Sequence, residues 1–196
     1  MTAARALASA VTAAALCAAA MWLWSRQPDL EANSMNPLRT YGRIGAVVTN
    51  DAFSVRIDRY DVAASITTTS LSNGAHVADG LFVVVHFHAR AERRPYKMKY
   101  VRLETRDGRT YNEGGRVGVL TRADGTYQPM LWGSGTLVFE VPEDRLAGAS
   151  VVIGQTYGPA VSDLTAESVI DLGIDDAKAA RLSTRPAANY HLGDRS

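Results

Sequence analysis

The segment "GLFVVVHFHAR", residues 80 to 90, is rich in β-branched and aromatic residues, which favour an extended backbone. In a strand, alternate side chains point to opposite faces. One face of this segment is apolar throughout: Leu81, Val83, Val85, Phe87 and Ala89. The other face begins apolar and ends polar: Phe82, Val84, His86, His88 and Arg90. The segment therefore predicts a central strand that is buried on one face, while the second half of its other face emerges into solvent.

The chain beyond residue 40 repeats this pattern in shorter pieces. Apolar runs of four to eight residues alternate with turn residues, and no long segment has a helical period. An apolar fraction of 46% over 196 residues is sufficient for a hydrophobic core. We expect strands near 43–48, 52–60, 62–68, 81–89, 97–105, 109–112, 135–141, 150–155 and 168–172. The pattern predicts a mainly β domain over residues 40–175, built as a sandwich or barrel.

The N-terminal segment 6–24 contains 19 residues without a charge. As a helix it would be about 28 Å long, close to the thickness of the hydrocarbon core of a bilayer. Trp22 and Trp24 lie where interfacial aromatic residues anchor the outer end of such a helix, and Arg5 supplies positive charge at the inner end. Residues 1–24 are therefore predicted to form a cytoplasmic stub and one transmembrane anchor, with the domain outside the cell. The alternative is a signal peptide cleaved near "CAAA", which would release a secreted protein.

Two polar segments flank the predicted domain. Residues 25–39 contain two prolines and no sustained period, which predicts a semi-flexible linker. Residues 176–196 have little apolar content and are expected to form a loose tail. The single cysteine, Cys17, lies inside the N-terminal apolar run, so the domain itself has no thiol for a disulfide or a zinc–cysteine cluster.

Four motifs in order resemble a known family. They are "AFSVRIDRYDVA", "GLFVVVHFHARA", "YVRLETRDGRTYN" and "GTLVFEVPEDRLAGASVVIG", within about residues 43–155. The chain is similar to the extracytoplasmic immunoglobulin-like domains of unknown function found on membrane-anchored or lipidated proteins of Gram-positive, actinobacterial-type bacteria. The motif positions are Phe53, Gly80, Phe82, Asp107, Gly108, Tyr111, Phe139, Val141 and Pro142. The resemblance implies an antiparallel two-sheet sandwich without known catalytic residues, but it explains neither "HFH" nor the chain beyond residue 156.

The histidines of "HFH" are the candidate metal ligands. His86 and His88 point to the same face of the predicted strand, and the triplet is similar to the strand that supplies two zinc ligands in α-type carbonic anhydrases. A zinc site needs three or four protein ligands, yet the remaining histidines, His76 and His191, fall in a predicted loop and the tail. The neighbouring "ARAERR" is basic and would repel a cation. We therefore expect two half-exposed histidines on a sheet surface, with no metal and no other cofactor.

Other catalytic patterns are incomplete. Ser134 lacks the first glycine of a nucleophile elbow, because Trp132 stands in that place. The carboxylates Asp171, Asp175 and Asp176 lack the ligand spacing of an EF-hand loop. A net charge of +1 without a basic stripe does not favour nucleic acid as a partner. We expect a protein that is not an enzyme.

A surface for recognition is the remaining hypothesis. The stretch from 112 to 134 mixes apolar residues with glycines, which fits either a loop packed on the sheet or an exposed contact patch. Tyr127, Met130 and Trp132 are the candidates for partner binding, because large side chains dominate interface energies. The expected function is a non-enzymatic interaction module, an accessory subunit of an envelope or transport complex that binds another membrane or envelope protein. The alternative is an extracytoplasmic ligand- or metal-binding protein that uses His86 and His88.

The anchor prediction has a direct test. If residues 6–24 are retained as a membrane helix, the full-length protein will stay in the membrane pellet after carbonate extraction, and its mass will include the N-terminus. A soluble product that begins near Met21 would show instead that the segment is a cleaved signal peptide.

Overall fold

The computed structural model describes residues 13, 15–22, 37–68, 75–98, 100–114, 125–154 and 165–192. The chain divides into two units, Met1–Asn36 and Pro37–Ser196. In the first unit, residues 15–22 are helical. Among the residues that the structure describes, no helix has the length and apolar character needed to cross a membrane. Much of the predicted anchor and linker lies outside the described residues, so the transmembrane helix stays a prediction.

The second unit is mainly β, as the sequence predicted. Its strands are β1 (Leu38–Arg43), β2 (Val48–Thr49), β3 (Phe53–Thr68), β4 (His76–Ala91), β5 (Tyr96–Lys97), β6 (Tyr100–Glu104), β7 (Thr110–Asn112), β8 (Thr126–Tyr127), β9 (Gly133–Val141), β10 (Ser150–Gly154), β11 (Ala166–Asp171) and β12 (Tyr190–Leu192). A 3-10 turn, η2 (Glu143–Arg145), follows β9, and one helix, α3 (Asp176–Thr184), follows β11.

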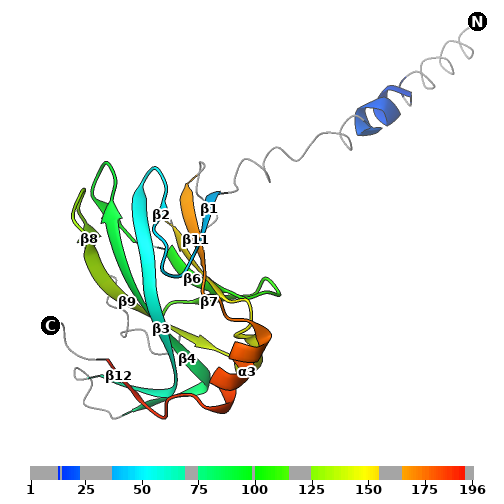
Figure 1. The fold of residues 1–196 in the computed structure, drawn as a ribbon. Coiled ribbons are helices and arrows are strands. Elements are labelled where there is room, and N and C mark those ends of the chain that lie inside the picture. Colours follow the sequence, from blue (N-terminus) through cyan, green and yellow to red (C-terminus); the bar gives the residue numbers. More distant parts are fainter. Residues whose placement is uncertain are drawn as a thin grey trace, which may run out of the picture. The chain divides into compact units, whose positions relative to one another are not determined.

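The strands form two large sheets (Figure 1). The first sheet has the order β1-β11-β10-β6-β7, and the second has the order β12-β3-β4-β9, with β2 paired to β3. A short ribbon of β5 and β8 completes the set. The pairings are antiparallel except for β1 with β11 and β12 with β3, which are parallel.

The strand order differs from that of an immunoglobulin constant-type domain. In such a domain the third strand lies in a different sheet from both the second and the fourth strands. Here β3 and β4 are hydrogen-bonded neighbours in one sheet, from Phe53 opposite Ala91 to Ile66 opposite His76. The chain therefore has the two-sheet sandwich architecture that the resemblance implied, with a different order of strands inside it.

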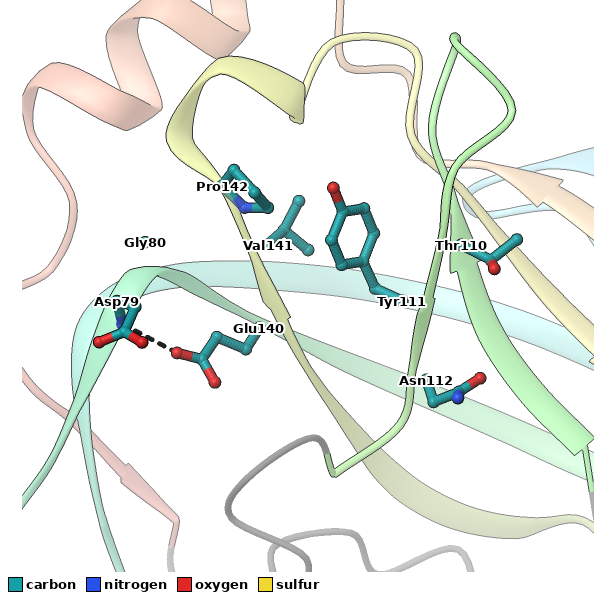
Figure 2. Close-up of a pocket in the computed structure, with 8 residues that line it drawn as sticks. All are labelled: Asp79, Gly80, Thr110, Tyr111, Asn112, Glu140, Val141 and Pro142. Carbon is teal, nitrogen blue, oxygen red and sulfur yellow. Dashed lines mark hydrogen bonds between the residues drawn. The ribbon is translucent and has the colours of Figure 1, made fainter.

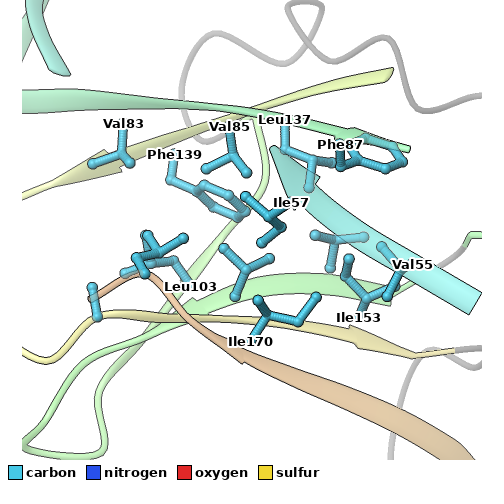
Figure 3. Packing of buried hydrophobic residues seen from close by; sticks show 14 of the residues in the cluster. Val55, Ile57, Val83, Val85, Phe87, Leu103, Leu137, Phe139, Ile153 and Ile170 are labelled. Atoms are coloured by element: carbon cyan, nitrogen blue, oxygen red, sulfur yellow. The ribbon is translucent and has the colours of Figure 1, made fainter. Parts of the chain in front are cut away.

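The core lies between the two sheets (Figure 3). The inward face of β4 is buried as predicted, and side chains of the second sheet such as Ile57 and Phe139 pack in one cluster with Leu103 and Ile170 of the first. On the outer face of β4, Phe82 is also buried and belongs to a smaller cluster. That smaller cluster comprises Ile66, Phe82, Val84, Val138 and Leu192. The prediction that the first half of this outer face is covered is confirmed.

Three strand predictions were wrong. Segment 97–105 is divided between β5 and β6, which lie in different sheets. Segments 52–60 and 62–68 form the single strand β3, whose register shifts between Ile57 and Arg59 and between Ala63 and Ser65. At the first shift Asp58 is an extra residue in β3, and at the second shift Ala64 of β3 lies opposite four residues of β4, 78–81, so β3 bends without ending. Segment 43–48 is not a strand, because β1 ends at Arg43 and a turn follows. That turn includes Gly45 with φ of 85°, a conformation that favours glycine.

The prediction of a loose tail from residue 176 was also wrong. Asp175 caps α3 by accepting a hydrogen bond at 2.7 Å from the backbone N–H of Lys178. Ala179 of this helix is buried in the core between the sheets. Further along, β12 pairs with β3, and Leu192 is buried on the outer face of the second sheet. A short capped helix and a three-residue strand need few apolar residues, which is why composition missed them.

The central core position of Phe139 gives a stability prediction. Its ring is 0% exposed, so Phe139→Ala should lower the free energy of unfolding by about 3 to 5 kcal/mol in a denaturant titration. Val77, which is 73% exposed on β4, provides the control: Val77→Ala should change that free energy by less than about 0.5 kcal/mol. A loss below about 1 kcal/mol for Phe139→Ala would contradict the register of β9.

Candidate functional site

Several strands begin or end at one end of the sandwich, which we call the entry end. β3 begins there at Phe53, which pairs with Ala91, the last residue of β4. β9 begins there at Gly133, which pairs with Ala89. The turns that join these strands therefore lie together.

The first sheet reaches the same end. β1 begins at Leu38, which pairs with Ala166 of β11. The next residue of β11 pairs with Gly154, the last residue of β10. The hydroxyl of Tyr96 donates a hydrogen bond of 2.9 Å to the carbonyl of Gly154. The ring of Tyr96 stacks on Phe53, with centroids 4.4 Å apart. Leu38, the first residue of the first strand, therefore lies at the entry end.

An exposed apolar segment precedes β9 at the entry end. Met130 is 79% exposed, Leu131 is 65% exposed and Trp132 is 38% exposed. We call these three residues the apolar turn. Pro129 forms a bridge with Ala91, which places the turn beside the end of β4. Large apolar side chains that remain exposed together in a folded domain indicate a contact surface.

The backbone of the apolar turn is strained. Met130 is the one non-glycine residue with positive φ, 64°, among those that the structure describes. This left-handed conformation costs an ordinary residue roughly 1 to 2 kcal/mol. Strained residues of this kind tend to occur at binding and catalytic sites. A pocket of about 300 Å³ adjoins the turn and is lined in part by Tyr127, Leu131 and Trp132.

The three predicted contact residues have different surroundings. Met130 and Trp132 lie together in the apolar turn, but Tyr127 is only 6% exposed and packs on Phe87 and Tyr96. Burial raises the pKa of Tyr127 to about 12, since an ionised phenolate would lose its hydration there. Predicting Tyr127 as a contact residue was wrong, because its ring fills the core under the β5–β8 ribbon. Much of the segment between β7 and β8, with Val117, Val119 and Leu120, lies outside the described residues.

Sequence reasoning missed Leu131 and the charges beside it. Arg93, Arg94 and Lys97 are exposed in the turn and short strand that follow β4. Lys97 pairs with Thr126 in the β5–β8 ribbon, so this basic segment runs beside the chain that leads into the apolar turn. The guanidinium of Arg90 lies 5.0 Å from the ring centre of Trp132. From the sequence, "ERR" suggested only repulsion of a metal ion. Its place at the entry end could not be predicted, because that place depends on strand pairing.

His86 and His88 lie on the outer face of β4, half-buried as expected. Nδ1 of His88 donates a hydrogen bond of 2.5 Å to Asp58, the extra residue at the first bulge of β3. Nε2 of His86 lies 3.3 Å from a carboxylate oxygen of Asp61 and 2.8 Å from the hydroxyl of Tyr190. Each imidazole therefore has its own carboxylate. Within the described ranges, no three histidine, cysteine or acidic side chains come together as a metal site would require.

The surroundings of this face shift two pKa values. Burial is the largest cause that lowers the pKa of His86, and the nearby Arg59 adds to it, while Asp61 opposes it. Burial would raise the pKa of Asp58, but hydrogen bonds from His88 and Arg56 outweigh it and lower the pKa. The hydrogen bond between Nε2 of His86 and the Tyr190 hydroxyl links β4 to β12.

The other polar candidates have structural partners. Ser134 pairs with His88 across β9 and β4, but no hydrogen bond joins their side chains among the described contacts, so Ser134, His88 and Asp58 do not form a connected relay. Asp171 accepts a hydrogen bond of 2.9 Å from the N–H of Gly173. Asp176 pairs with Arg106 at 3.0 Å. These carboxylates support turns and the helix.

A second pocket, of about 460 Å³, lies at the far ends of β7 and β9 (Figure 2). Tyr111, Val141 and Pro142 line it together with Gly80, so several motif positions of the family resemblance meet here. A β-carbon at Gly80 would lie 2.4 Å from the carbonyl oxygen of Val141, which explains the glycine. The N–H of Asp79 donates a hydrogen bond of 2.8 Å to Glu140 across the two strands. The motif residues therefore hold β4 and β9 close together.

Comparisons with known proteins do not identify the chain. No family model and no curated protein matches it. Among solved structures, it is similar to an uncharacterized β-sandwich protein from Clostridium difficile 630, with 10% identity, a TM-score of 0.39 and coverage of 69% of this chain and 95% of that one. It is also similar to MPT63, a secreted protein from Mycobacterium tuberculosis, with 16% identity, a TM-score of 0.46 and coverage of 70% and 99%. These scores carry no functional argument, and the sandwich architecture rests on this chain's own strand pairing.

The lowered pKa of His86 predicts a pH effect on stability. At pH values between the lowered pKa of His86 in the folded chain and its ordinary pKa of about 6.5, His86 binds a proton more readily in the unfolded chain than in the folded one. The free energy of unfolding should therefore fall as the pH drops below about 6.5. His86→Gln should make this fall smaller in denaturant titrations between pH 7.5 and 5. His191→Gln, which replaces an exposed histidine on β12, is the control and should retain the wild-type slope. Equal slopes for all three proteins would contradict the assignment.

Proposed function

We propose that this chain is a membrane-anchored extracytoplasmic interaction module with an immunoglobulin-like sandwich, which serves a membrane or envelope complex as a non-enzymatic accessory subunit. Residues 6–24 act as the single-pass anchor, with the N-terminus in the cytoplasm. The apolar turn at the entry end makes the contact. Neither His86 nor His88 adds a second function, because each imidazole is engaged by its own aspartate in the described part of the chain.

The observation that carries this proposal is the exposure of Met130 and Leu131, at 79% and 65%. A folded domain gains stability by burying such side chains, so their joint exposure beside Trp132 needs a reason outside the domain. Trp, Met and Arg are enriched in protein interfaces, and Arg90 lies against Trp132 here. The apolar turn is therefore the best candidate for a binding hot spot.

Tethering strengthens this argument. The stretch from Ser25 to Asn36 has 12 residues and would span about 20 Å as a flexible coil. Such a tether raises the effective concentration of the domain near other components of the same membrane. A contact of only a few side chains is then sufficient to hold an assembly.

Substitutions in the apolar turn test the proposal by co-purification from native membranes in mild detergent. Trp132→Ala and Leu131→Ala should each lower recovery of a partner by on the order of 10-fold, as for hot-spot residues. Both variants should keep the wild-type circular dichroism spectrum and membrane retention, because the side chains lie at the surface.

Val77→Ala is the matched control, since it removes an exposed apolar side chain at the other end of β4. It should leave recovery of the partner unchanged. If Trp132→Ala unfolds the protein, the ring is part of the core and the contact must be assigned elsewhere. If both turn variants recover the partner as well as wild type does, the apolar turn is not the binding surface.

A further inference from the structure

We propose that the entry end docks on an anionic lipid surface, with the apolar turn in the interfacial region of the bilayer and the adjacent basic segment at the lipid phosphates. This inference rests on the membrane tether of the proposed function and assigns the same surface to lipid, so the lipid contact and the protein contact tested by co-purification exclude one another. It commits to lipid instead of a protein, for three reasons that follow from the described residues.

The first reason is the chemistry of the apolar turn. Met130 and Leu131 are the most exposed of its side chains, and Trp132 is half-exposed beside them. Trp is the residue that prefers the boundary between lipid headgroups and acyl chains, because its ring is apolar and its N–H is polar. Aliphatic side chains next to it can insert below the phosphates. Positive φ at Met130 shows that the chain keeps this projecting turn although its backbone is strained.

The second reason is the charge next to the turn. Residues 90–97 carry four cationic side chains and one carboxylate. Arg93 and Arg94 are exposed, as is Lys97, whose strand pairs with β8 just before the apolar turn. The carboxylate, Glu92, is 3.1 Å from Arg90, and the ion pair of Arg93 within the described part of the chain is a distant one, 4.0 Å from the exposed Asp51. Exposed cations around an apolar tip match the negative potential of an anionic leaflet.

The third reason is the place where the tether joins. Leu38 is the first residue of β1, lies at the entry end and is itself 57% exposed. A domain tethered to a membrane through this residue is held by the end that carries both the apolar turn and the basic segment. Because the tether already restricts the translation of the domain, docking costs little additional translational entropy.

The experiment uses the full chain with one fluorescent reporter. Cys17, the only cysteine, is replaced by serine, and Gln128→Cys places an environment-sensitive label in the exposed chain before the turn. Val77→Cys in the same background places the control label at the other end of β4. Each protein is reconstituted through its anchor into vesicles of phosphatidylcholine alone or of phosphatidylcholine with phosphatidylglycerol, both containing a headgroup-level nitroxide quencher.

The label at position 128 should be quenched on the anionic vesicles and not on the neutral ones, and high salt should reverse the quenching. The label at position 77 should stay unquenched on both. The pair Arg93→Gln and Arg94→Gln should lower the ratio of quenched to unquenched label by on the order of 10-fold. Arg181→Gln with Arg185→Gln is the matched control for charge, from α3 and its C-cap, and should have no effect. Leu131→Ser should also lower the ratio.

An unquenched label at position 128 on anionic vesicles overturns the lipid inference. If that label is nevertheless shielded in native membranes, the entry end contacts a protein and the proposed function stands without the lipid. If it is exposed in native membranes too, both the lipid inference and the proposed contact surface are wrong. Quenching that is equal at positions 128 and 77 also overturns the inference, since it would show adsorption without a preferred end.

Discussion

The fold depends on the pairing of β4 with strands on both of its sides. β4 runs beside β3 on one edge, and its residues Leu81 to Ala89 also pair with β9 on the other edge, so the backbone groups of this central stretch are satisfied inside the sheet. Its inward side chains then form the floor of the core on which β6, β10 and β11 are packed (Figure 3). Because side chains alternate strictly in a strand, a shift by one residue would expose that floor and bury His86 and His88.

The same pairing determines where contact chemistry can occur. Phe53 at the start of β3, Ala91 at the end of β4 and Gly133 at the start of β9 lie at one edge of the sheet, so the turns next to them gather at the entry end. A turn there lies outside the hydrogen-bonded strands, so its side chains need not alternate between the core and the solvent. That freedom is visible in Met130, which is exposed, and in Tyr127, three residues earlier, which is buried because it still belongs to β8.

The sequence was sufficient for the elements whose pattern is local. The alternation from Leu81 to Arg90 predicted both faces of β4. It was insufficient where partners lie far away in the chain. That Ala91 lies beside Pro129 is a property of strand pairing, as is the contact of Tyr190 with His86. The capped helix α3 was missed because nine residues with one buried alanine have almost no apolar period.

The parallel pairing of β1 with β11 and of β3 with β12 has a consequence for how the protein is made. The partners of β1 and β3 in these pairings are synthesised more than 120 residues after them, since Leu38 pairs with Ala166 and Ile66 pairs with Tyr190. A nascent chain that is still missing its last residues leaves Phe82 and Val84 uncovered on the outer face, beside a ribosome or a translocation channel. The sandwich therefore cannot be completed before residue 192 has been made, and chains that terminate earlier carry an apolar surface by which chaperones and proteases can recognise them.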